Sequence, residues 1–155
     1  PFHAPGFDHA TVILIDDQGT GQAYYWAGYP EHGLESPIVG WGDLIVKKGL
    51  YYGSTEQADK NGTYVKILVN DPKVSFKKLR DELDRVATTI DSLHVRYAPV
   101  PGLLGTRNSN SAARALLEQG VHLNLTKLGI ATDPTGRLQP GWNLTINLRP
   151  PKKLQ

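Results

Sequence analysis

The sequence predicts an α+β fold, in which an antiparallel sheet is packed by one long amphipathic helix and one short helix. Three observations lead to this prediction. An apolar run at residues 11–15 is followed by turn residues and an aromatic run at 22–27, which is the pattern of a β-hairpin. In residues 75–92 the apolar side chains recur at spacings of three and four, as they do in a helix with one buried face. A polar turn then leads into a second helix, which is expected to run from Ser109 to about Gly120 as its C-cap.

The first half of the chain is expected to supply the strands. Residues 11–15 are apolar on both faces, which predicts a central strand, and residues 22–27 return beside them after a turn rich in Asp and Gly. The Gly- and Pro-rich stretch at 28–42 is expected to be a long loop of the kind that often carries function. Short apolar runs predict further strands at 44–46 and 64–69.

The second half begins where Asp71 and Pro72 end the last of these strands. The helix that follows should bury one stripe of apolar side chains against the sheet, while its charged residues lie largely off that stripe. The stripe consists of Phe76, Leu79, Leu83, Val86 and Ile90. Residues 95–98 are expected to be extended, and the alternation in residues 142–148 predicts a last strand.

Length and composition narrow the class of protein. A chain of 155 residues is expected to form a single domain, here spanning residues 1–155. The net charge of +2 and the scattered lysine pairs argue against a strong nucleic-acid binder. No apolar run is long enough for a transmembrane segment, which predicts a soluble chain. With no cysteine, five scattered histidines and no phosphate-binding loop, we expect neither a metal site nor a cofactor.

The most informative segment is the polar turn Asn108-Ser109-Asn110-Ser111 in front of an apolar helix. Asn108 is a good N-cap residue because its side-chain oxygen can accept the first free N–H groups of the helix. Ser109 would then occupy the first helical position, where the positive end of the helix dipole can stabilise an anion that develops during a reaction. The alternative is that all four polar residues only cap the helix.

A histidine precedes the first strand, in the segment Asp8-His9-Ala10-Thr11-Val12. Histidine is the usual general base at neutral pH, and the end of a strand is a position from which it can face a cleft. His9 and Ser109 are therefore a candidate base and nucleophile. The alternative is that His9 merely begins a strand.

These two motifs, in this order, resemble the circularly permuted branch of the papain-like NlpC/P60 superfamily. In that branch the histidine-bearing strand comes first and the nucleophile-bearing helix comes last. Its helix typically begins with Asn-Cys, so that Asn108-Ser109 matches it with serine in the cysteine position. The resemblance implies one papain-like domain in which Ser109 is the nucleophile, its N–H is part of an oxyanion hole, and His9 is the base. The serine is either natural, or part of a degenerate site, or a replacement for cysteine.

A third catalytic residue should orient the histidine. The resembling family takes this residue from the strand after the histidine strand, and the hairpin is expected to bring that strand close to His9. Glu31 is our candidate, with His32 and Gln22 as alternatives.

Substrate contacts are expected from two groups of residues. Asn108 and Asn110 flank the candidate nucleophile. Tyr25 and Trp26 belong to an aromatic run that would form a wall for a sugar or a lipid, or else belong to core and sheet packing.

The expected function is that of a hydrolase or acyltransferase that acts on an amide or ester bond through a covalent acyl intermediate. The resemblance implies peptidoglycan peptide, protein or lipid as the substrate. Because the chain starts without methionine or a secretory signal, we interpret it as an excised domain or processed product. It looks like the toxic domain of a bacterial polymorphic toxin or secreted effector, which implies delivery from the producing cell and a neutralising immunity protein. Two alternatives stay open: a catalytically degenerate binding module for a glycan, lipid or protein partner, and a nuclease-type toxin that uses His9 and Asn108.

Overall fold

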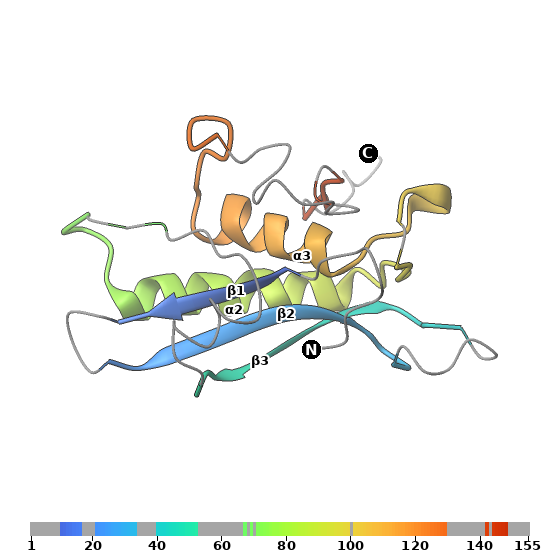
Figure 1. The fold of residues 1–155 in the computed structure, drawn as a ribbon, viewed down its shortest axis with the longest axis horizontal. Helices are drawn as coiled ribbons and strands as arrows, with labels where there is room; N and C mark the ends of the chain where they lie inside the picture. Colours follow the sequence, from blue (N-terminus) through green and yellow to red (C-terminus); the bar gives the residue numbers. More distant parts are fainter. Residues whose placement is uncertain are drawn as a thin grey trace, which may run out of the picture.

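The computed structural model describes residues 10–16, 21–33, 40–52, 67, 69, 71–99, 101–129, 142 and 144–148. Within these residues, three strands form one antiparallel sheet, and the helices pack against it (Figure 1). The strands are β1 (Thr11–Ile15), β2 (Ala23–Pro30) and β3 (Leu44–Leu50), and the two α-helices are α2 (Phe76–Ser92) and α3 (Ser109–Ala115). The chain therefore has a small α+β fold, as its sequence predicts.

In the sheet, β2 lies between β1 and β3. The β1–β2 hairpin pairs Thr11 with Ala27, and the N–H of Asp16 donates to the Gln22 carbonyl at 2.9 Å near its turn. The prediction that residues 11–15 form the central strand is wrong within the described residues, where β1 pairs with β2 alone. The apolar run suggested a strand buried along its whole length. Ile15 is 42% exposed, however, so only part of the run belongs to the core.

Both β2 and β3 extend further than the sequence predicts. β2 continues through Gly28 to Pro30, and β3 continues past Lys48 to Leu50. Glycine, proline and lysine are poor strand formers by themselves. The ladder between the two strands is continuous over this whole length, so that each strand holds the other in the extended conformation. A local pattern could not reveal this cross-strand support.

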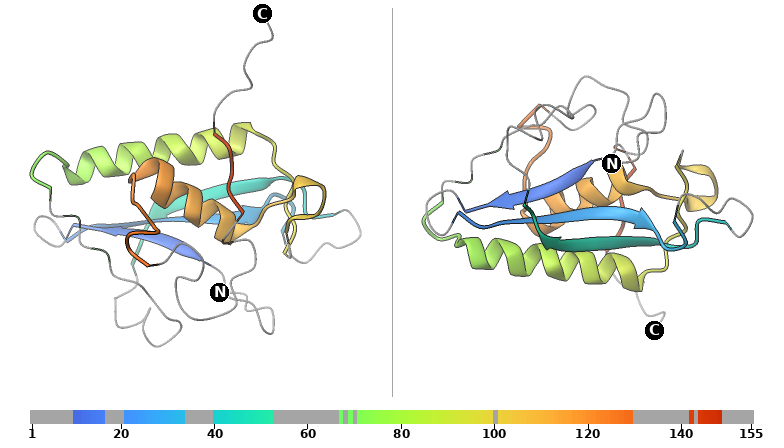
Figure 2. Two further views of the ribbon diagram at one scale, coloured as in Figure 1. Left: turned by 90° about the horizontal axis from the view of Figure 1, so that it is seen from above. Right: turned by 60° about the horizontal axis from the view of Figure 1, so that its bottom comes forward.

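The long helix α2 forms as its apolar stripe predicts. Ser75 is its N-cap, and the Ser75 hydroxyl accepts the N–H of Lys78 at 3.1 Å. The helix lies along β3, whereas α3 lies against β2 and β1 (Figure 2). Phe76, the first member of the predicted stripe, is only half-buried. The buried residues of α2 are Leu79, Leu83, Val86, Ala87 and Ile90.

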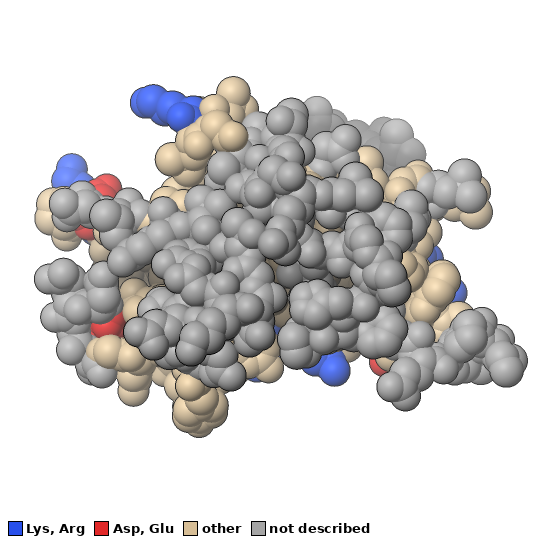
Figure 3. Space-filling model, viewed as in Figure 1, with Lys and Arg blue, Asp and Glu red and all other residues tan. Residues whose placement is uncertain are grey.

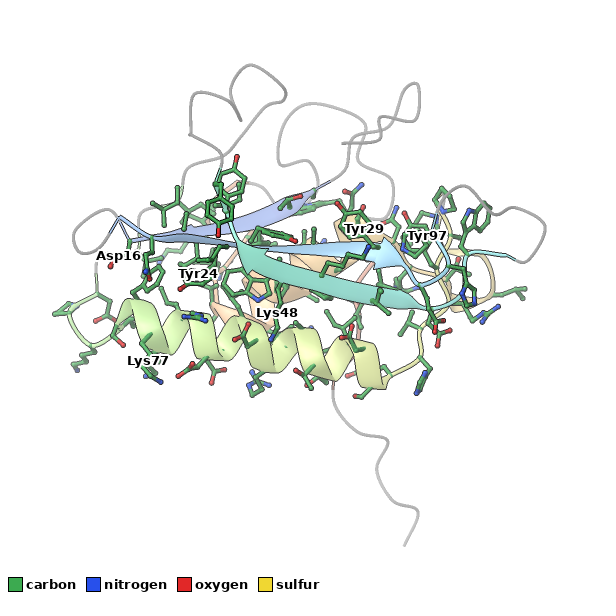
Figure 4. All side chains as sticks on the ribbon, turned by 90° about the horizontal axis from the view of Figure 1, so that it is seen from below. Asp16, Tyr24, Tyr29, Lys48, Lys77 and Tyr97 are labelled. Atoms are coloured by element: carbon green, nitrogen blue, oxygen red, sulfur yellow. The ribbon has the colours of Figure 1, made fainter. Side chains whose placement is uncertain are left out.

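Two carboxylates of α2 fasten the helix to the sheet. Asp84 Oδ1 accepts the indole N–H of Trp26 at 2.9 Å and lies 3.1 Å from Nζ of Lys48, which Figure 4 shows beside the helix. Asp91 accepts the backbone N–H of Val46 at 2.7 Å. A buried donor without an acceptor costs about 1–3 kcal/mol, so these carboxylates favour one position of α2 along the sheet.

After α2 the chain forms the extended piece predicted at 95–98. Arg96 pairs with the start of β3, and Tyr97 pairs in parallel with Arg107. Between these pairings the chain passes through a 3-10 turn, η1 (Leu103–Gly105). Leu104 in this turn has a left-handed backbone (φ 53°) and is 93% exposed. Such a backbone costs roughly 1–2 kcal/mol for a residue with a side chain, so the turn is strained.

The helical segment that begins at Ser109 ends at Gly120, as predicted, but Gly120 is not its C-cap. α3 continues into a π-helical turn, η2 (Leu116–Gly120), and the left-handed residue that follows is His122 (φ 59°) rather than Gly120. Gly120 instead permits close packing on α2, because a methyl group there would stand 3.2 Å from Cδ2 of Leu83. The glycine marks a helix contact and not a C-cap.

The last predicted strand, at 142–148, is also wrong where the structure describes it. Residues 144–148 join no ladder of described strands. The carbonyl oxygens of Thr145 and Ile146 accept hydrogen bonds from the side chains of Arg107 at 2.8 Å and Gln119 at 2.9 Å instead. Side chains from the α3 region therefore take the place of a neighbouring strand.

One hydrophobic core joins the sheet to both helices. It includes Trp26 and Leu44 from the sheet, Leu83 from α2, Ala112 from α3 and Leu116 from η2. Ile67 packs against it, although most of the strand predicted at 64–69 lies outside the described residues. In the part of the chain that the structure describes, we find no helix long and apolar enough to cross a bilayer.

Candidate active site at the start of α3

Asn108 caps α3 as the sequence predicts. Its backbone is extended (φ −141°, ψ −170°), and its Oδ1 accepts the N–H groups of Asn110 at 3.1 Å and Ser111 at 3.2 Å. The Ser111 hydroxyl lies 3.4 Å from the same oxygen. The Asn108 amide donates to the Pro99 carbonyl at 3.1 Å. These hydrogen bonds stabilise the first turn of α3. They give the side chains of Asn108 and Ser111 a structural role.

Asn110 has a different role from the cap. It is 1% exposed, and its Oδ1 accepts the backbone N–H of Ala10 at 2.8 Å. Ala10 directly precedes β1. The side chain of Asn110 therefore ties the beginning of the first strand to the beginning of α3, two segments that are 100 residues apart.

Ser109 is the member of the motif that capping does not explain. It is 4% exposed, yet no hydrogen bond joins its hydroxyl to any residue that the structure describes. Buried polar groups in folded proteins almost always have a partner, and a missing partner costs about 1–3 kcal/mol. The N–H of Ser109 belongs to the first helical turn, whose N–H groups have no acceptor within the helix. Ser109 therefore carries both a hydroxyl that could act as a nucleophile and a backbone N–H that could donate to an anion.

Gly28 of β2 packs directly against the backbone of Ser109. A methyl group on Gly28 would stand 2.8 Å from Cα of Ser109, 2.9 Å from Cβ of Ala112 and 3.0 Å from Cδ1 of Leu44. Strand and helix therefore meet backbone to backbone at the candidate nucleophile. Sequence reasoning missed Gly28, which it placed in a loop. A glycine at the end of an aromatic strand is the signal that could have found it, since strand glycines often mark a close backbone approach.

His9 lies outside the described residues, so its side chain is not compared with Ser109. Its neighbour in the chain, Ala10, is described, and it lies at the Asn110 side chain. The candidate third residue, Glu31, directly follows β2. Its Oε2 accepts the N–H of Asp43 at 3.2 Å and lies 3.9 Å from Nε2 of His32.

The alternatives for the third residue lie in different places. His32 contacts Glu31 itself. Gln22 precedes β2, at the end of the strand opposite Gly28, where it accepts the Tyr24 hydroxyl at 3.2 Å. Because Gly28 is the β2 residue beneath Ser109, Gln22 is remote from the candidate site, and Glu31 is at the nearer end of the strand.

The predicted aromatic wall does not form as one surface. Trp26 is 1% exposed and donates its indole N–H to Asp84 of α2. Tyr25 is half-buried, and its ring lies over Gly49 of β3. Neighbouring residues of a strand point to opposite faces, so the two rings cannot share a wall. Trp26 belongs to the core, which is the alternative that the sequence left open.

Sequence reasoning also missed a buried tyrosine near the site. Tyr97 is 8% exposed and pairs with Arg107, the residue before Asn108. Burial raises the pKa of the Tyr97 phenol above its ordinary value, and the phenol of Tyr29 raises it further. Figure 4 shows both tyrosines at the same end of the sheet. Nζ of Lys47 lies 4.8 Å from the centre of the Tyr29 ring.

A second polar cluster surrounds Asp43 at the start of β3. One carboxylate oxygen lies 2.9 Å from Nδ1 of His94, and the other lies 3.4 Å from a guanidinium nitrogen of Arg96. The His94 side chain is 78% exposed, so this cluster is on the surface. Among the described residues, no three His, Asp or Glu side chains gather in a way that could hold a metal ion.

Comparisons of the chain with models of protein families, with curated proteins and with solved structures find no match. The contacts around Ser109 are therefore the basis for assigning a function. They are the Asn108 cap of α3, the buried Ser109 hydroxyl, the close approach of Gly28, and the hydrogen bond between Asn110 and Ala10.

Proposed function

We propose that this chain is a hydrolase or acyltransferase that cleaves an amide or ester bond through an acyl intermediate on Ser109. The observation that carries the proposal is the buried Ser109 hydroxyl, which has no partner among the described residues. Its neighbours Asn108, Asn110 and Ser111 are all engaged in hydrogen bonds of the fold. A hydroxyl that makes no such hydrogen bond is available to a general base, as a nucleophile must be.

His9 is the proposed base. His9 immediately precedes Ala10 in the sequence, and the N–H of Ala10 donates to the side chain of Asn110, the residue after Ser109. In the proposed reaction, the His9 imidazole takes the proton of the Ser109 hydroxyl while the oxygen attacks the substrate carbonyl carbon. The imidazolium then protonates the leaving amine or alcohol, and water or another acceptor releases the acyl group.

The start of α3 would stabilise the transition state of this reaction. The N–H of Ser109 and the positive end of the helix dipole favour negative charge on the carbonyl oxygen. Because Asn108 already accepts the N–H groups of Asn110 and Ser111, Ser109 is the residue of this turn whose N–H we assign to the oxyanion. The arrangement proposed is the permuted papain-like one, with the base before the first strand and the nucleophile on the last described helix.

Glu31 is the proposed partner of the base. β2 runs antiparallel to β1, and Thr11, the first residue of β1, pairs with Ala27, so β2 continues past the start of β1 to Pro30. Glu31 follows that end, and the N–H of Asp43 holds its carboxylate. A carboxylate there would orient the imidazole and stabilise its charged form.

A nucleic-acid substrate is less well supported. Several basic side chains of the described residues are paired with acids four residues further along the chain, as Lys77 is with Asp81 and Arg114 with Glu118. On the face drawn in Figure 3, the described Lys and Arg side chains lie apart from one another near the edges. Nucleic-acid binding needs clustered positive charge, so we favour acyl transfer.

A fluorophosphonate probe tests the proposal. An activated serine displaces fluoride from phosphorus and forms a stable Oγ–P bond, whereas a capping serine does not react. The N-cap of α2, Ser75, supplies an internal control in the same molecule. We expect mass spectrometry to find the label on Ser109 and not on Ser75, and we expect both Ser109→Ala and His9→Ala to abolish it. Equal labelling of the two serines, or none at Ser109, would refute the proposal.

A further inference from the structure

The two faces of the sheet carry different side chains. Trp26 and Gly28 of β2 point toward the helices, because Trp26 donates to α2 and Gly28 packs against α3. Neighbouring residues of a strand point to opposite faces, so Tyr25 and Tyr29 point away from both helices. We call this second face the tyrosine face. With the neighbours that the strand register adds, it comprises Ile13, Tyr25, Tyr29, Ile45 and Lys47.

Gly49 of β3 gives the ring of Tyr25 room to lie on the sheet. Cε1 and Cζ of that ring stand 3.3 Å and 3.8 Å from the position that a methyl group on Gly49 would occupy. The ring therefore leans across β3, with one side on the backbone and the other directed outward. Tyr29 is four residues further along the same strand, which places its Cα about 13 Å from that of Tyr25. Ala27 between them is small and buried, so the two rings stand in line along β2.

The tyrosine face has little net charge. Nζ of Lys47 lies 4.8 Å from the centre of the Tyr29 ring, so this ammonium group already interacts with an aromatic face. Asp43 continues the same side of β3, and its carboxylate is matched by His94 at 2.9 Å and Arg96 at 3.4 Å. Nucleic acids and anionic lipids bind to clusters of positive charge. The described side chains of this face therefore favour a neutral ligand.

We propose that the tyrosine face binds a neutral glycan of the straight, flat β-1,4-linked kind. Sugar rings present C–H groups that pack on the electron-rich face of an aromatic ring, and two tyrosines in line on one strand suit a straight chain of such rings. The hydroxyl groups at the edges of the sugars need polar partners. The side chains of His94 and Arg96 are exposed and stand beside Asp43, so this cluster supplies donors at the end of the face.

This binding surface is independent of the chemistry of Ser109, which packs on the opposite face of the sheet. It pairs Tyr25 with Tyr29 and not with Trp26, which belongs to the core. Ser109→Ala should therefore keep glycan binding, and the variant distinguishes failure of the proposed function from failure of this inference.

The test is calorimetric titration of the whole chain with cellohexaose and with chitohexaose, two neutral β-1,4-linked sugars. We expect saturable binding of at least one of them. Its affinity should change less than about twofold between about 50 and about 500 mM salt, because no counterions are released. Binding of neither sugar would overturn the inference. So would tighter, salt-sensitive binding of a thymidine oligonucleotide, since that result would assign the face to nucleic acid.

Two leucine substitutions form a matched pair. Tyr25→Leu removes a ring of the tyrosine face, whereas Tyr24→Leu removes a ring of the opposite face, where Cζ of Arg80 lies 4.0 Å from the centre of the Tyr24 ring. We expect Tyr25→Leu to weaken sugar binding about tenfold and Tyr24→Leu less than about twofold, while Tyr25→Phe stays within about threefold of the parent. Equal losses in the two leucine variants would contradict a site on this face.

Analytical ultracentrifugation shows whether a second copy of the chain covers the face instead. We expect the parent to sediment as a monomer without sugar, and a dimer that Tyr25→Leu dissociates would overturn the inference. If Tyr25→Leu does not fold, Arg96→Gln replaces it, because an exposed ion pair contributes little to stability. We expect Arg96→Gln to weaken sugar binding about threefold, and an unchanged affinity would then count against the site.

Discussion

Gly28 and Ser109 meet with no side chain between them. A methyl group on Gly28 would stand 2.8 Å from Cα of Ser109, a separation that real side chains essentially never show. The close approach seats the first turn of α3 directly on β2. The glycine is needed here for space and not for its backbone freedom, since its φ is not positive.

We expect Gly28→Ala to lower the free energy of unfolding by about 1–3 kcal/mol, because the added methyl group overpacks a contact between two backbones. Urea denaturation measures this effect. The matched control is Gly49→Ala in β3, where the nearest atom is the edge of the Tyr25 ring at 3.3 Å. That ring can shift, so a change below about 1 kcal/mol in either direction is expected. Equal effects of the two substitutions would show that α3 is not seated on β2 in this way.

Leu83 tests the core between α2 and the sheet. It is 0% exposed, so Leu83→Ala should cost about 2–5 kcal/mol through lost burial and a remaining cavity. Thr88, an exposed residue of the same helix, is the control, and Thr88→Ala should change stability by less than about 0.5 kcal/mol. Thermal and urea unfolding of both variants would reveal a misassigned helix face if the Leu83 effect were as small as the Thr88 effect.

Asp84 separates a hydrogen bond from an ion pair. Asp84→Ala removes the acceptor of the buried Trp26 indole, which should cost about 1–3 kcal/mol. Asp84→Asn keeps an amide oxygen for the indole and loses the ion pair with Lys48. The Lys48 side chain is 45% exposed, so that loss should cost only about 0–1 kcal/mol. Urea denaturation should therefore rank the asparagine variant between the parent and the alanine variant, and the reverse order would be incompatible with this contact.

Tyr97 should make the protein sensitive to alkaline pH. Burial and the neighbouring Tyr29 raise the pKa of Tyr97 above the value of 10.0 that it has when exposed. Above pH 10 the unfolded chain releases the phenolic proton while the folded chain keeps it, so the unfolded state is favoured. This contribution to stability is complete below the unfolded pKa and is lost as the pH rises through the folded pKa.

The corresponding measurement is urea unfolding of the parent and of Tyr97→Phe between pH 8 and about pH 11. We expect the stability of the parent to fall more steeply with pH than that of the variant. Absorbance at the phenolate band should show one tyrosine fewer titrating late in Tyr97→Phe. Parallel stability curves would mean that the Tyr97 phenol is not desolvated in the folded protein.

The helices were predictable because their signals are local. The cap and stripe of α2 lie within residues 75–92, and Asn108 caps α3 from the adjacent position. The lengths of β2 and β3 were not predictable, since their ends are held by pairing across the sheet. The burial of Trp26 likewise depends on Asp84, which is 58 residues away.

In the candidate site, too, local features were predictable from the sequence and contacts between distant residues were not. The pattern of residues 108–111 identified the cap and placed Ser109 at the first helical position. It could not distinguish the role of Asn110 from that of its neighbours, because that role is defined by Ala10. Gly28 was missed for a related reason: a glycine has no side chain to signal a contact, and the contact is with a helix far along the chain.

The hydrogen bond between Ala10 and Asn110 has a consequence for how the chain acquires its structure. It closes a loop of 100 residues, and such long-range closures carry a larger entropic cost and form more slowly than local contacts. The hairpin of β1 and β2 and the helix α2 can each form from neighbouring residues. Synthesis proceeds from the N-terminus. A nascent chain that already contains both elements therefore still lacks the contacts that position Ser109. The hydrogen bond between Asn110 and Ala10 can form only after Asn110 has left the ribosome and α3 packs against the start of β1.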